Sequence, residues 1–575
     1  MQKDNSKENN ENNQKDNIHH VHHNHTNEND HQASTNSEDF EGLFWADQLA
    51  QEIINREKFR YLDNKIQKPD MFTVKTSASL SGVLHIGRLS DTIRGSSVYQ
   101  ALKDAGVKAR LIWVAEDMDP LRKVPEGVPA DYEKYIGMSV TDIPDPNGCH
   151  SSYAEHHVSE YFKVIDEFVS EKMEKFSMRA EYRAGNFKPY IKKILENIET
   201  ITEIQNRYRT NPLKKGWSSW TPICDNCGKI ITPRVTDFVD GKVLYTCKDY
   251  AFEKYVAKGC GHKGENDPLK GNGKMVWKSE WASQWARWQV VSEGAGKEYQ
   301  VPNSAFWINA EIVEKVHGFP APVPIFYEHL MIDSVKMSAS VGNVVYPADW
   351  LEVASPEMLR LFYNKRLMTT RSFSWKDLPN MYDEEDHIIQ VVEGKISLEN
   401  MKEEMHLKRL FEISHGHKKT QFCPVPFSHA VVVVQTSEKE EDVEKILKKT
   451  GHWDDKKKDV ILNRISKAKT WVEKYAPDEA KFKLQNEVPE SLSSRLSEEQ
   501  KKALHMLADK LPEKDWDDKT LFNEIYEISK ETGVKAKDLF KAGYNVLLNK
   551  DRGPKLAPFI LIIGKEKAAE LFGKV

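Results

Sequence analysis

Residues 71–88, Met-Phe-Thr-Val-Lys-Thr-Ser-Ala-Ser-Leu-Ser-Gly-Val-Leu-His-Ile-Gly-Arg, join an apolar segment to the start of a helix. The first five of these residues predict a buried strand, and the small residues after them predict a loop. We expect a helix from about His85 to Asp104, ended by Gly106, and a second strand over residues 107–114. This order of strand, crossover helix and strand is the βαβ unit of a parallel sheet. The stretch therefore predicts an α/β fold with its ligand at the carboxyl ends of the strands.

The helix start within this stretch carries groups that suit a phosphate ligand. The N-terminus of a helix offers free N–H groups and the positive end of its dipole. His85 adds a donor for a phosphate oxygen, and Gly87 lets a nucleotide base approach the backbone closely. A lone His-x-Gly at a helix start is more often structural than catalytic, so the interpretation needs a second motif.

That second motif lies far downstream, in residues 336–343, Lys-Met-Ser-Ala-Ser-Val-Gly-Asn. A loop with a lysine, two hydroxyls and a Gly-Asn turn is suited to bring a cation and donors onto a polyphosphate. In this order, the two motifs resemble the His-Ile-Gly-His and Lys-Met-Ser-Lys-Ser elements of class I aminoacyl-tRNA synthetases.

Longer strings narrow this resemblance to the class I lysyl-tRNA synthetases, the archaeal-type lysine–tRNA ligases. These strings are Trp45-Ala-Asp47, Leu121-Arg-Lys-Val-Pro125, Pro144-Asp-Pro-Asn-Gly-Cys-His150, Tyr153-Ala-Glu-His156, Gly342-Asn-Val344, Trp350-Leu-Glu-Val353, Trp471-Val-Glu-Lys-Tyr-Ala-Pro477 and Arg552-Gly-Pro-Lys-Leu-Ala557. They extend from about Leu43 to the C-terminus. The resemblance implies that the chain activates lysine with ATP and Mg²⁺ and transfers it to tRNA(Lys).

The resemblance also implies a Rossmann-like catalytic core that is split by a zinc-containing insertion and followed by an α-helical anticodon-binding region. The expected division is a disordered Asn/His-rich tail (1–40), the first half of the catalytic domain (41–135), the insertion with zinc sites (136–300), the second half with the Lys-Met-Ser-Ala-Ser loop (301–376), a helical stem (377–490) and a helical anticodon-binding region (491–575). The tail has too few apolar residues to offset its ordering entropy. We expect the sheet to resume at residues 306–310 and 324–327, and helices near 459–475 and 498–511.

Two groups of residues have the composition of zinc sites. Asp145, Cys149, His150 and His156 offer one oxygen, one sulfur and two nitrogens in a short segment. From spacing alone, a core thiol beside surface histidines is an equally good interpretation, and it is the resemblance that implies zinc here.

The second group is the Cys-x-x-Cys pair Cys224 and Cys227 with Cys247 and Cys260. A Cys-x-x-Cys knuckle supplies two ligands from one turn, and short strands at 229–232 and 242–245 suit a zinc ribbon. Whether Cys260 or His262 completes the set stays open, and four unrelated core thiols are the alternative. Both zinc ions would be structural, because amino-acid activation needs no Lewis acid there.

The resemblance implies roles for individual residues of the active site. The catalytic residues are His85, Lys336, Ser338 and Ser340; ATP is bound by Gly82, His85, Gly87, Arg88, Lys336 and Met337; the amino acid is bound by Ser77, Ser79, Asp91, Trp281, Tyr299, Tyr327 and Glu328. A carboxylate for the lysine ammonium and aromatic faces for its stem are the chemistry that this pocket needs. Asp117 and Asp119 end the second strand and are candidates for ligand or magnesium binding.

The chain departs from the family at several of these positions. Ser77 stands where relatives have glycine, Ser79-Leu80 replaces Thr-Pro, and Arg88 replaces asparagine or histidine. Tyr299 stands where a histidine is expected, and Val341 replaces a second loop lysine. One alternative is therefore a catalytically weakened or altered-specificity paralogue that binds RNA. A zinc-dependent RNA-binding protein with a vestigial nucleotide fold is another.

Composition sets the remaining limits. The chain has 575 residues, of which 39% are hydrophobic and 30% are charged, with a net charge of −5. No apolar run approaches the roughly 20 residues that span a bilayer, and no secretory signal is apparent. We therefore expect a cytoplasmic protein without a membrane partner. The basic pair Lys214 and Lys215 and the run 456–458 are more often solvated faces than nucleic-acid sites.

Overall fold

The computed structural model describes residues 42–80, 84–124, 128–336, 344–416, 418, 420–437 and 439–575. The expected disorder of residues 1–40 lies outside this range. Within it, no helix is both long and apolar enough to cross a membrane.

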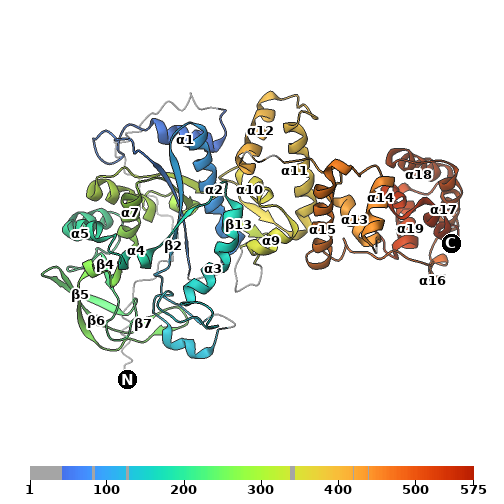
Figure 1. The fold of residues 1–575 in the computed structure, drawn as a ribbon. Helices are drawn as coiled ribbons and strands as arrows, with labels where there is room; N and C mark the ends of the chain where they lie inside the picture. The colour runs from blue at the N-terminus through green and yellow to red at the C-terminus, as the bar shows by residue number, and fades with distance from the viewer. Residues whose placement is uncertain are drawn as a thin grey trace, which may run out of the picture. The chain divides into compact units, whose positions relative to one another are not determined.

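A five-stranded parallel sheet forms the centre of the catalytic region (Figure 1), in the order β12-β11-β1-β2-β3. Its strands are β1 (Phe72–Ser79), β2 (Ala109–Glu116), β3 (Glu174–Ser177), β11 (Val290–Gly296) and β12 (Val323–Tyr327). The crossover between β1 and β2 is helix α2 (Ile86–Asp104). The α/β fold, the first strand, the helix and the second strand expected from residues 71–114 are confirmed.

Helices cover both faces of the sheet because β2 is apolar on both sides. Leu111 and Trp113 pack in one apolar cluster with α1 (Trp45–Asn55), α2 and α10 (Pro356–Asn364). Ile112 and Val114 point to the other face and pack in a second cluster with helices of the insertion. Those helices are α5 (Lys188–Glu196), α6 (Ile198–Asn206) and α7 (Trp277–Trp288), and α8 (Ala305–Ile312), which follows β11, packs in the same cluster. A run of consecutive apolar residues is the expected pattern of a strand that is buried on both faces.

Two expectations about the return of the sheet have different outcomes. The strand expected at 324–327 is confirmed as β12, but the strand expected at 306–310 is wrong because these residues lie in α8. Phe306 packs there against Trp281 and Trp285 of α7, with ring centroids 5.4 and 5.1 Å away. A short apolar run is ambiguous between strand and buried helix. Strand β11 was missed, since its sequence Val-Val-Ser-Glu-Gly-Ala-Gly is only weakly apolar.

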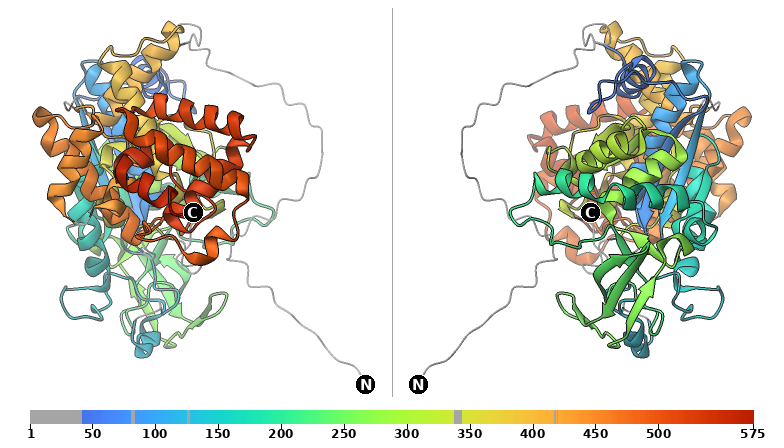
Figure 2. Two further views of the ribbon diagram at one scale, coloured as in Figure 1. Left: turned by 90° about the vertical axis from the view of Figure 1, so that its right-hand side faces the viewer. Right: turned by 90° about the vertical axis from the view of Figure 1, so that its left-hand side faces the viewer.

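The insertion between β3 and β11 contains a small antiparallel sheet in the order β5-β6-β9, seen among the green strands of Figure 2. Its strands are β5 (Pro233–Val239), β6 (Lys242–Cys247) and β9 (Lys263–Asn266). The strand expected at 242–245 is confirmed, whereas 229–232 is a turn region and the strand starts only at Pro233. Short elements complete the region: α4 (Met178–Arg183), β4 (Trp220–Pro222), β7 (Tyr250–Ala251), β8 (Val256–Ala257) and β10 (Gly273–Met275). Helix α3 (Tyr153–Ile165) lies before β3.

After β12 the chain forms a small sheet and then becomes helical. The sheet has β13 (Leu330–Ile332), β14 (Val335–Lys336) and β15 (Arg371–Phe373), with α9 (Pro347–Val353) and α10 between β14 and β15. The helices that follow are α11 (Leu378–Val392), α12 (Met401–His415), α13 (Phe427–Thr436), α14 (Glu440–Lys449), α15 (Lys458–Lys474), α16 (Glu490–Ser493), α17 (Glu498–Lys510), α18 (Asp518–Thr532), α19 (Ala536–Leu548), α20 (Leu556–Ile563) and α21 (Lys565–Phe572). Helices α15 and α17 confirm the two helices expected in this region.

A buried ion pair joins two helices of this segment. The guanidinium of Arg464 in α15 donates to both carboxylate oxygens of Asp386 in α11, at 2.6 and 2.9 Å. The indole N–H of Trp471 in α15 donates to the carbonyl of Trp375, at 2.9 Å. Bidentate pairing has strict geometry, so these contacts orient α15 on the preceding segment.

Candidate active site and metal centres

The carboxyl ends of the parallel strands gather most of the predicted substrate residues. Ser79 at the end of β1 lies opposite Glu116 at the end of β2, and Gly296 at the end of β11 lies opposite Tyr327 at the end of β12. Ser77 lies on β1, Tyr299 follows β11, and Glu328 follows β12; Trp281 lies on α7 and Asp91 on α2. This is the edge at which open parallel sheets bind ligands.

His85 caps the N-terminus of α2. Its Nδ1 accepts a hydrogen bond from the backbone N–H of Gly87 at 3.1 Å. Burial, reinforced by the nearby positive charge of Arg88, lowers the pKa of His85 to about 4. A neutral imidazole that accepts through Nδ1 carries its proton on Nε2. His85 therefore presents an N–H donor at the helix N-terminus at neutral pH, and Arg88 is exposed on the first turn of the helix.

The chain that follows the second motif packs against this helix start. The backbone N–H of Ile86 donates to the carbonyl of Val345 at 2.9 Å, and the hydroxyl of Tyr363 donates to the carbonyl of Ile86 at 3.0 Å. Val345 follows the predicted lysine loop, and Lys336 ends strand β14 just before it. The expectations for Gly82, Met337, Ser338 and Ser340 lie outside the described residues. The chain thus returns from the loop beside the first motif.

Asp91 lies on α2, six residues after His85, and is buried among strand ends. One carboxylate oxygen accepts from the backbone N–H of Ser77 at 3.2 Å. A methyl group added to Gly294 of β11 would lie 1.8 Å from the other oxygen and 3.3 Å from the ring of Tyr327. Only glycine allows this close approach. Burial, followed by repulsion from Glu293, raises the pKa of Asp91 to about 7.

Glu293 of β11 forms a buried charged cluster with Lys75 that sequence reasoning missed. The ammonium of Lys75 lies 2.6 Å from one carboxylate oxygen of Glu293. The other oxygen accepts from the indole N–H groups of Trp281 and Trp285, at 2.9 and 2.5 Å. The only signal in the sequence is a charged residue inside each of two apolar segments. Glu293 is satisfied by three donors, which leaves Asp91 as the carboxylate nearest to Ser77 and Tyr327.

Aromatic rings surround this part of the site. Trp281 is 3% exposed and stacks on Trp277 at 4.8 Å. The ring of Tyr299, which is half-buried, meets that of Trp281 edge-on at 5.4 Å. The guanidinium of Arg94 lies over Tyr327 at 4.9 Å, an arrangement that favours the cation by the ring quadrupole. Trp281 is therefore a wall residue, held behind Tyr299.

Two charged residues at the carboxyl edge of the sheet, Glu328 and Asp119, are paired with other side chains of this chain. The carboxylate of Glu328 lies 2.9 Å from the ammonium of Lys297, and this hydrogen bond lowers the pKa of Glu328. Asp119 accepts from the hydroxyl of Ser79 at 2.5 Å and lies 3.6 Å from the ammonium of Lys274.

Asp117, at the end of β2, is similarly engaged. Its carboxylate accepts from the hydroxyl of Ser177 and, at 2.9 Å, from the backbone N–H of Arg179. Burial raises the pKa of Asp117 to about 6 although both hydrogen bonds oppose this shift. Asp117 and Asp119 are thus both held by donors from the chain itself.

The first predicted metal group is assembled as a compact cluster. The Sγ atom of Cys149 lies 3.1 Å from Nδ1 of His150, 3.2 Å from Nδ1 of His156 and 3.2 Å from a carboxylate oxygen of Asp145. A tetrahedral site with bonds of about 2.0–2.3 Å has edges of about 3.3–3.8 Å. Gly148, at φ +68, makes the turn that returns Cys149 to Asp145. These four residues could hold a metal ion.

The Nε2 atoms of the two histidines in this cluster also have partners within the chain. The Nε2 atom of His150 lies 3.0 Å from the hydroxyl of Ser159, and that of His156 lies 3.4 Å from the side-chain amide of Asn147. Such partners fix the ring orientation of histidine ligands. Both rings therefore present Nδ1 to the centre of the cluster.

The second group contains four cysteines, and Cys260 completes it. The Sγ atoms of Cys224 and Cys260 are 3.6 Å apart, and those of Cys227 and Cys247 are 3.7 Å apart. These separations match the edge of a tetrahedron with metal–sulfur bonds of about 2.3 Å. The ring of His262 lies instead against Tyr245, at 6.1 Å. This geometry favours Cys260 over His262 as the fourth ligand.

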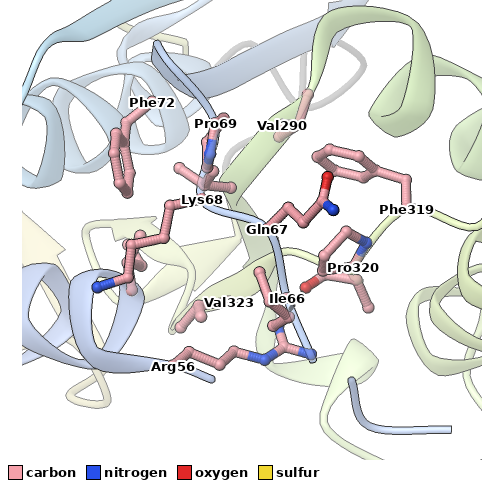
Figure 3. A pocket seen from close by; sticks show the side chains of 13 residues that line it. Arg56, Ile66, Gln67, Lys68, Pro69, Phe72, Val290, Phe319, Pro320 and Val323 are labelled. Atoms are coloured by element: carbon pink, nitrogen blue, oxygen red, sulfur yellow. Dashed lines mark hydrogen bonds between the residues drawn. The ribbon is translucent and has the colours of Figure 1, made fainter. Parts of the chain in front are cut away.

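A cavity at the opposite edge of the sheet is too small to bind a nucleotide or an amino acid (Figure 3). It lies at the amino ends of three strands, between Phe72, Val290 and Val323, and Lys68 and Phe319 close its sides. Its volume of about 40 Å³ is room for little more than a water molecule. Most of the predicted substrate residues lie instead at the carboxyl edge.

Comparison with known proteins identifies the family. Residues 43–417 match the family described as "tRNA synthetases class I (K)", and residues 436–570 match "Anticodon binding domain". A lysine–tRNA ligase from Thermococcus kodakarensis is 33% identical over 91% of this chain and 98% of its own length. Lysine–tRNA ligases from Pyrococcus furiosus, with 32% identity over 91% and 98%, and Methanosphaera stadtmanae, with 29% over 92% and 98%, are similar along their whole lengths. The chain belongs to the class I lysyl-tRNA synthetase family.

Proposed function

We propose that this protein is a lysine–tRNA ligase, which activates lysine with ATP and transfers it to tRNA(Lys). The observation that carries the proposal is that the chain leaving the second motif is hydrogen-bonded to the N-terminus of α2, where the first motif lies. Ile86 is hydrogen-bonded there to Val345, and the buried carboxyl of Asp91 lies on the same helix, five residues after Ile86. Phosphate-binding groups and a carboxylate for an ammonium thus share one edge of the sheet.

In the first step, a carboxylate oxygen of lysine attacks the α-phosphorus of ATP. The bond from this phosphorus to the bridging oxygen of the β-phosphate breaks, giving lysyl-adenylate and pyrophosphate. His85 donates from Nε2 to a phosphate oxygen, and the N-terminus of α2 contributes its free N–H groups and dipole. Lys336, Ser338 and Ser340 contribute charge and donors to the same phosphates. Catalysis is positioning plus charge stabilisation, without a covalent enzyme intermediate.

The amino-acid pocket distinguishes lysine by its ammonium. Asp91 supplies the negative charge, with Ser77 and Tyr327 beside it. The aromatic ring of Tyr299 covers the stem, with Trp281 behind it. Ser79 and Glu328 lie at the rim of the pocket. Ser79 is hydrogen-bonded there to Asp119, and Glu328 forms an ion pair with Lys297.

In the second step, a hydroxyl of the terminal tRNA ribose attacks the carbonyl carbon of the adenylate. The bond to the phosphate oxygen breaks, AMP leaves, and the hydroxyl proton goes to the departing phosphate or to solvent. The helical regions that we assign to 377–490 and 491–575 would hold the tRNA. The catalytic halves are assigned to 41–135 and 301–376 and the insertion to 136–300. A ligase that supplies translation is expected in the cytoplasm.

Two kinds of metal accompany this assignment. When bound to ATP, Mg²⁺ would neutralise phosphate charge. The carboxylates of Asp117 and Asp119 already accept hydrogen bonds from this chain, so we assign Mg²⁺ to the phosphates rather than to these carboxylates. Zinc fits both four-residue clusters, because their donor types and separations suit a tetrahedral ion. Closed sets of four protein ligands are typical of structural zinc, so both ions would stabilise the insertion.

Amino-acid-dependent exchange of pyrophosphate into ATP tests the proposal. The purified full chain is assayed with each of the twenty amino acids in turn, with and without tRNA(Lys). Lysine-dependent exchange is expected. Exchange with another amino acid would identify a changed pocket at Ser77 and Tyr299, and no exchange with any amino acid would overturn the proposed activity.

A further inference from the structure

Strand β10 of the insertion brings the side chain of Lys274 to the carboxyl edge of the parallel sheet. β10 pairs with β4 in antiparallel register, with Lys274 opposite Thr221, and β4 ends two residues before Cys224 of the four-cysteine cluster. The ammonium of Lys274 lies 3.6 Å from the carboxylate of Asp119, which follows β2. The insertion therefore contributes a charged group to the edge at which the predicted substrate residues lie.

Two carboxylates hold the side chain of Lys274 as a cation. Besides Asp119, the carboxylate of Glu280 in α7 lies 3.2 Å from the ammonium. Burial alone would lower the pKa of Lys274, but attraction to Glu280, followed by attraction to Asp119, raises it. The side chain of Lys274 is 17% exposed, so little water competes with these two partners.

Glu280 accounts for the charge of Lys274 but not for its contact with Asp119. The side chain of Glu280 is 1% exposed, and its Oε1 accepts from the hydroxyl of Tyr182 at 2.6 Å. Its Oε2 faces the ammonium of Lys274 as an ion pair rather than as a directed hydrogen bond. Lys274 thus neutralises a buried carboxylate on one side and reaches Asp119 on the other.

Asp119 connects Lys274 to a residue of the predicted lysine pocket. Its Oδ1 faces Lys274, whereas its Oδ2 accepts from the hydroxyl of Ser79 at 2.5 Å. A serine hydroxyl has one proton, and Ser79 donates this proton to Asp119. Toward any other group, Ser79 can then act only as an acceptor. An acceptor oxygen suits the ammonium groups of a lysine substrate, which are donors.

We propose that Lys274 is a positioning residue for lysine binding: through Asp119, it fixes the hydroxyl of Ser79 as an acceptor for an ammonium group of the substrate. Lys274 acts through Asp119 and makes no contact of its own with the substrate. The insertion thereby takes part in amino-acid binding as well as in holding metal. The inference rests on the proposed function, because it takes lysine as the substrate and Ser79 as one of the residues that bind it.

The test uses Ser79 as its reference, because a residue that acts through Ser79 has no effect once the hydroxyl is removed. K274M alone would leave the buried carboxylate of Glu280 without its counter-charge and weaken folding. K274M/E280Q removes both charges together and avoids this penalty. D119A removes the acceptor of Ser79 and leaves the pair of Lys274 and Glu280 in place.

K229M is the matched control in the full chain. Lys229 is also a lysine of the insertion, 9% exposed, and its ammonium donates to the carbonyl of Lys258 at 3.0 Å. K229M should therefore keep the parent KM for lysine even where it lowers the Tm. K274R keeps a cation beside Asp119 and should bring the KM for lysine back toward the parent value.

Lysine-dependent pyrophosphate exchange then separates lysine binding from a general disturbance of the site. S79A, D119A and K274M/E280Q should each raise the KM for lysine by about 10–100-fold, the worth of a hydrogen bond to a charged group. The kcat and the KM for ATP should stay close to those of the parent. Adding S79A to K274M/E280Q should raise the KM for lysine no further than S79A alone.

A parent KM for lysine in K274M/E280Q overturns the proposal, and so does an effect that multiplies with that of S79A. An equal rise in the KM for ATP also overturns it, since the whole edge would then be disturbed. A parent protein that exchanges with no amino acid overturns the proposed function together with this inference. In a parent that does exchange with lysine, failure of the variants to behave as expected overturns the inference alone.

Discussion

The hydrogen bond and the protonation state of His85 together leave it one donor for phosphate. Its Nδ1 is occupied by the Gly87 N–H, and the pKa of about 4 keeps the ring neutral, so Nε2 is the donor left for phosphate. We expect H85A to reduce the rate of lysine-dependent exchange by about 10²–10³-fold, the usual loss for one donor to developing charge. H505A, an exposed histidine in α17, is the control.

The pH dependence of the exchange rate checks the same residue. Because the pKa of His85 lies near 4, its protonation should leave the rate unaffected between about pH 6 and 9. A rate change with an apparent pKa between 6 and 7 that disappears in H85A would contradict the assigned protonation state.

Asp91 is expected to make lysine binding depend on pH. Its pKa of about 7 means that the carboxyl becomes ionised as the pH rises from 6 to 8, and only the ionised form attracts an ammonium. The KM for lysine should therefore fall over this range. D91N should raise it by roughly 10–100-fold, the worth of a hydrogen bond to a charged group, and abolish the pH dependence. A steep dependence that persists in D91N would assign it to another group.

The same residue should limit stability at high pH. A free aspartate has a pKa of about 3.9, whereas that of folded Asp91 is about 7, so the folded state binds the extra proton between these values. The contribution of this proton to the free energy of unfolding is fully present below about pH 4 and is lost as the pH rises through 7. In thermal unfolding without ligand, D91N should raise the Tm by about 2–4 °C at pH 8 and have little effect at pH 4. Equal effects at both values would contradict the burial argument.

Val341 is the departure from the family with the clearest consequence. The family motif that residues 336–343 resemble has a second lysine at this position, which would neutralise charge that develops on pyrophosphate. V341K should therefore raise the exchange rate by about 10-fold or more, since a lost donor costs about 10²–10³-fold. Arg88, exposed on the first turn of α2, is the candidate for compensation, and R88N should slow the parent more than it slows V341K. An unchanged rate in V341K would show that the second cation is not needed.

At the scale of elements, the sequence predicts best what is local and strongly patterned. β1 and α2 were found because a continuous apolar strand, small residues and a glycine stop follow one another within one stretch. β11 was missed because Ser292, Glu293 and two glycines weaken its apolar pattern. The link between Lys75 and Glu293 spans 218 positions, and no local signal reports such a distance.

The cysteine cluster makes a prediction at the same scale. Metal analysis of the purified chain should find about two zinc ions, one for each four-residue cluster. C260S should lose one ion and lower the thermal stability, whereas H262A should keep both, because the ring of His262 packs on Tyr245. The reverse result, with zinc lost in H262A and kept in C260S, would contradict the assigned ligand set. H156A should separately lose the ion of the other cluster.

At the scale of the whole molecule, family resemblance and structure agree on architecture, while the roles of the site residues stay predictions. The parallel sheet, the helical C-terminal region and both four-residue clusters were anticipated, because their motifs are spread along the chain. The sequence could not show that Trp281 is a buried wall residue or that Ser79 is bonded to Asp119. Both facts depend on packing between segments that are distant in sequence.

Charging of tRNA tests the central claim most directly. The full chain is incubated with ATP, Mg²⁺, labelled lysine and a tRNA(Lys) transcript, and lysine is measured on the 3′-terminal adenosine. The proposed function predicts an alkali-labile lysyl ester on this transcript and none on a transcript that lacks the terminal adenosine. No lysyl ester despite bound tRNA, or an ester formed only with another amino acid, would contradict it.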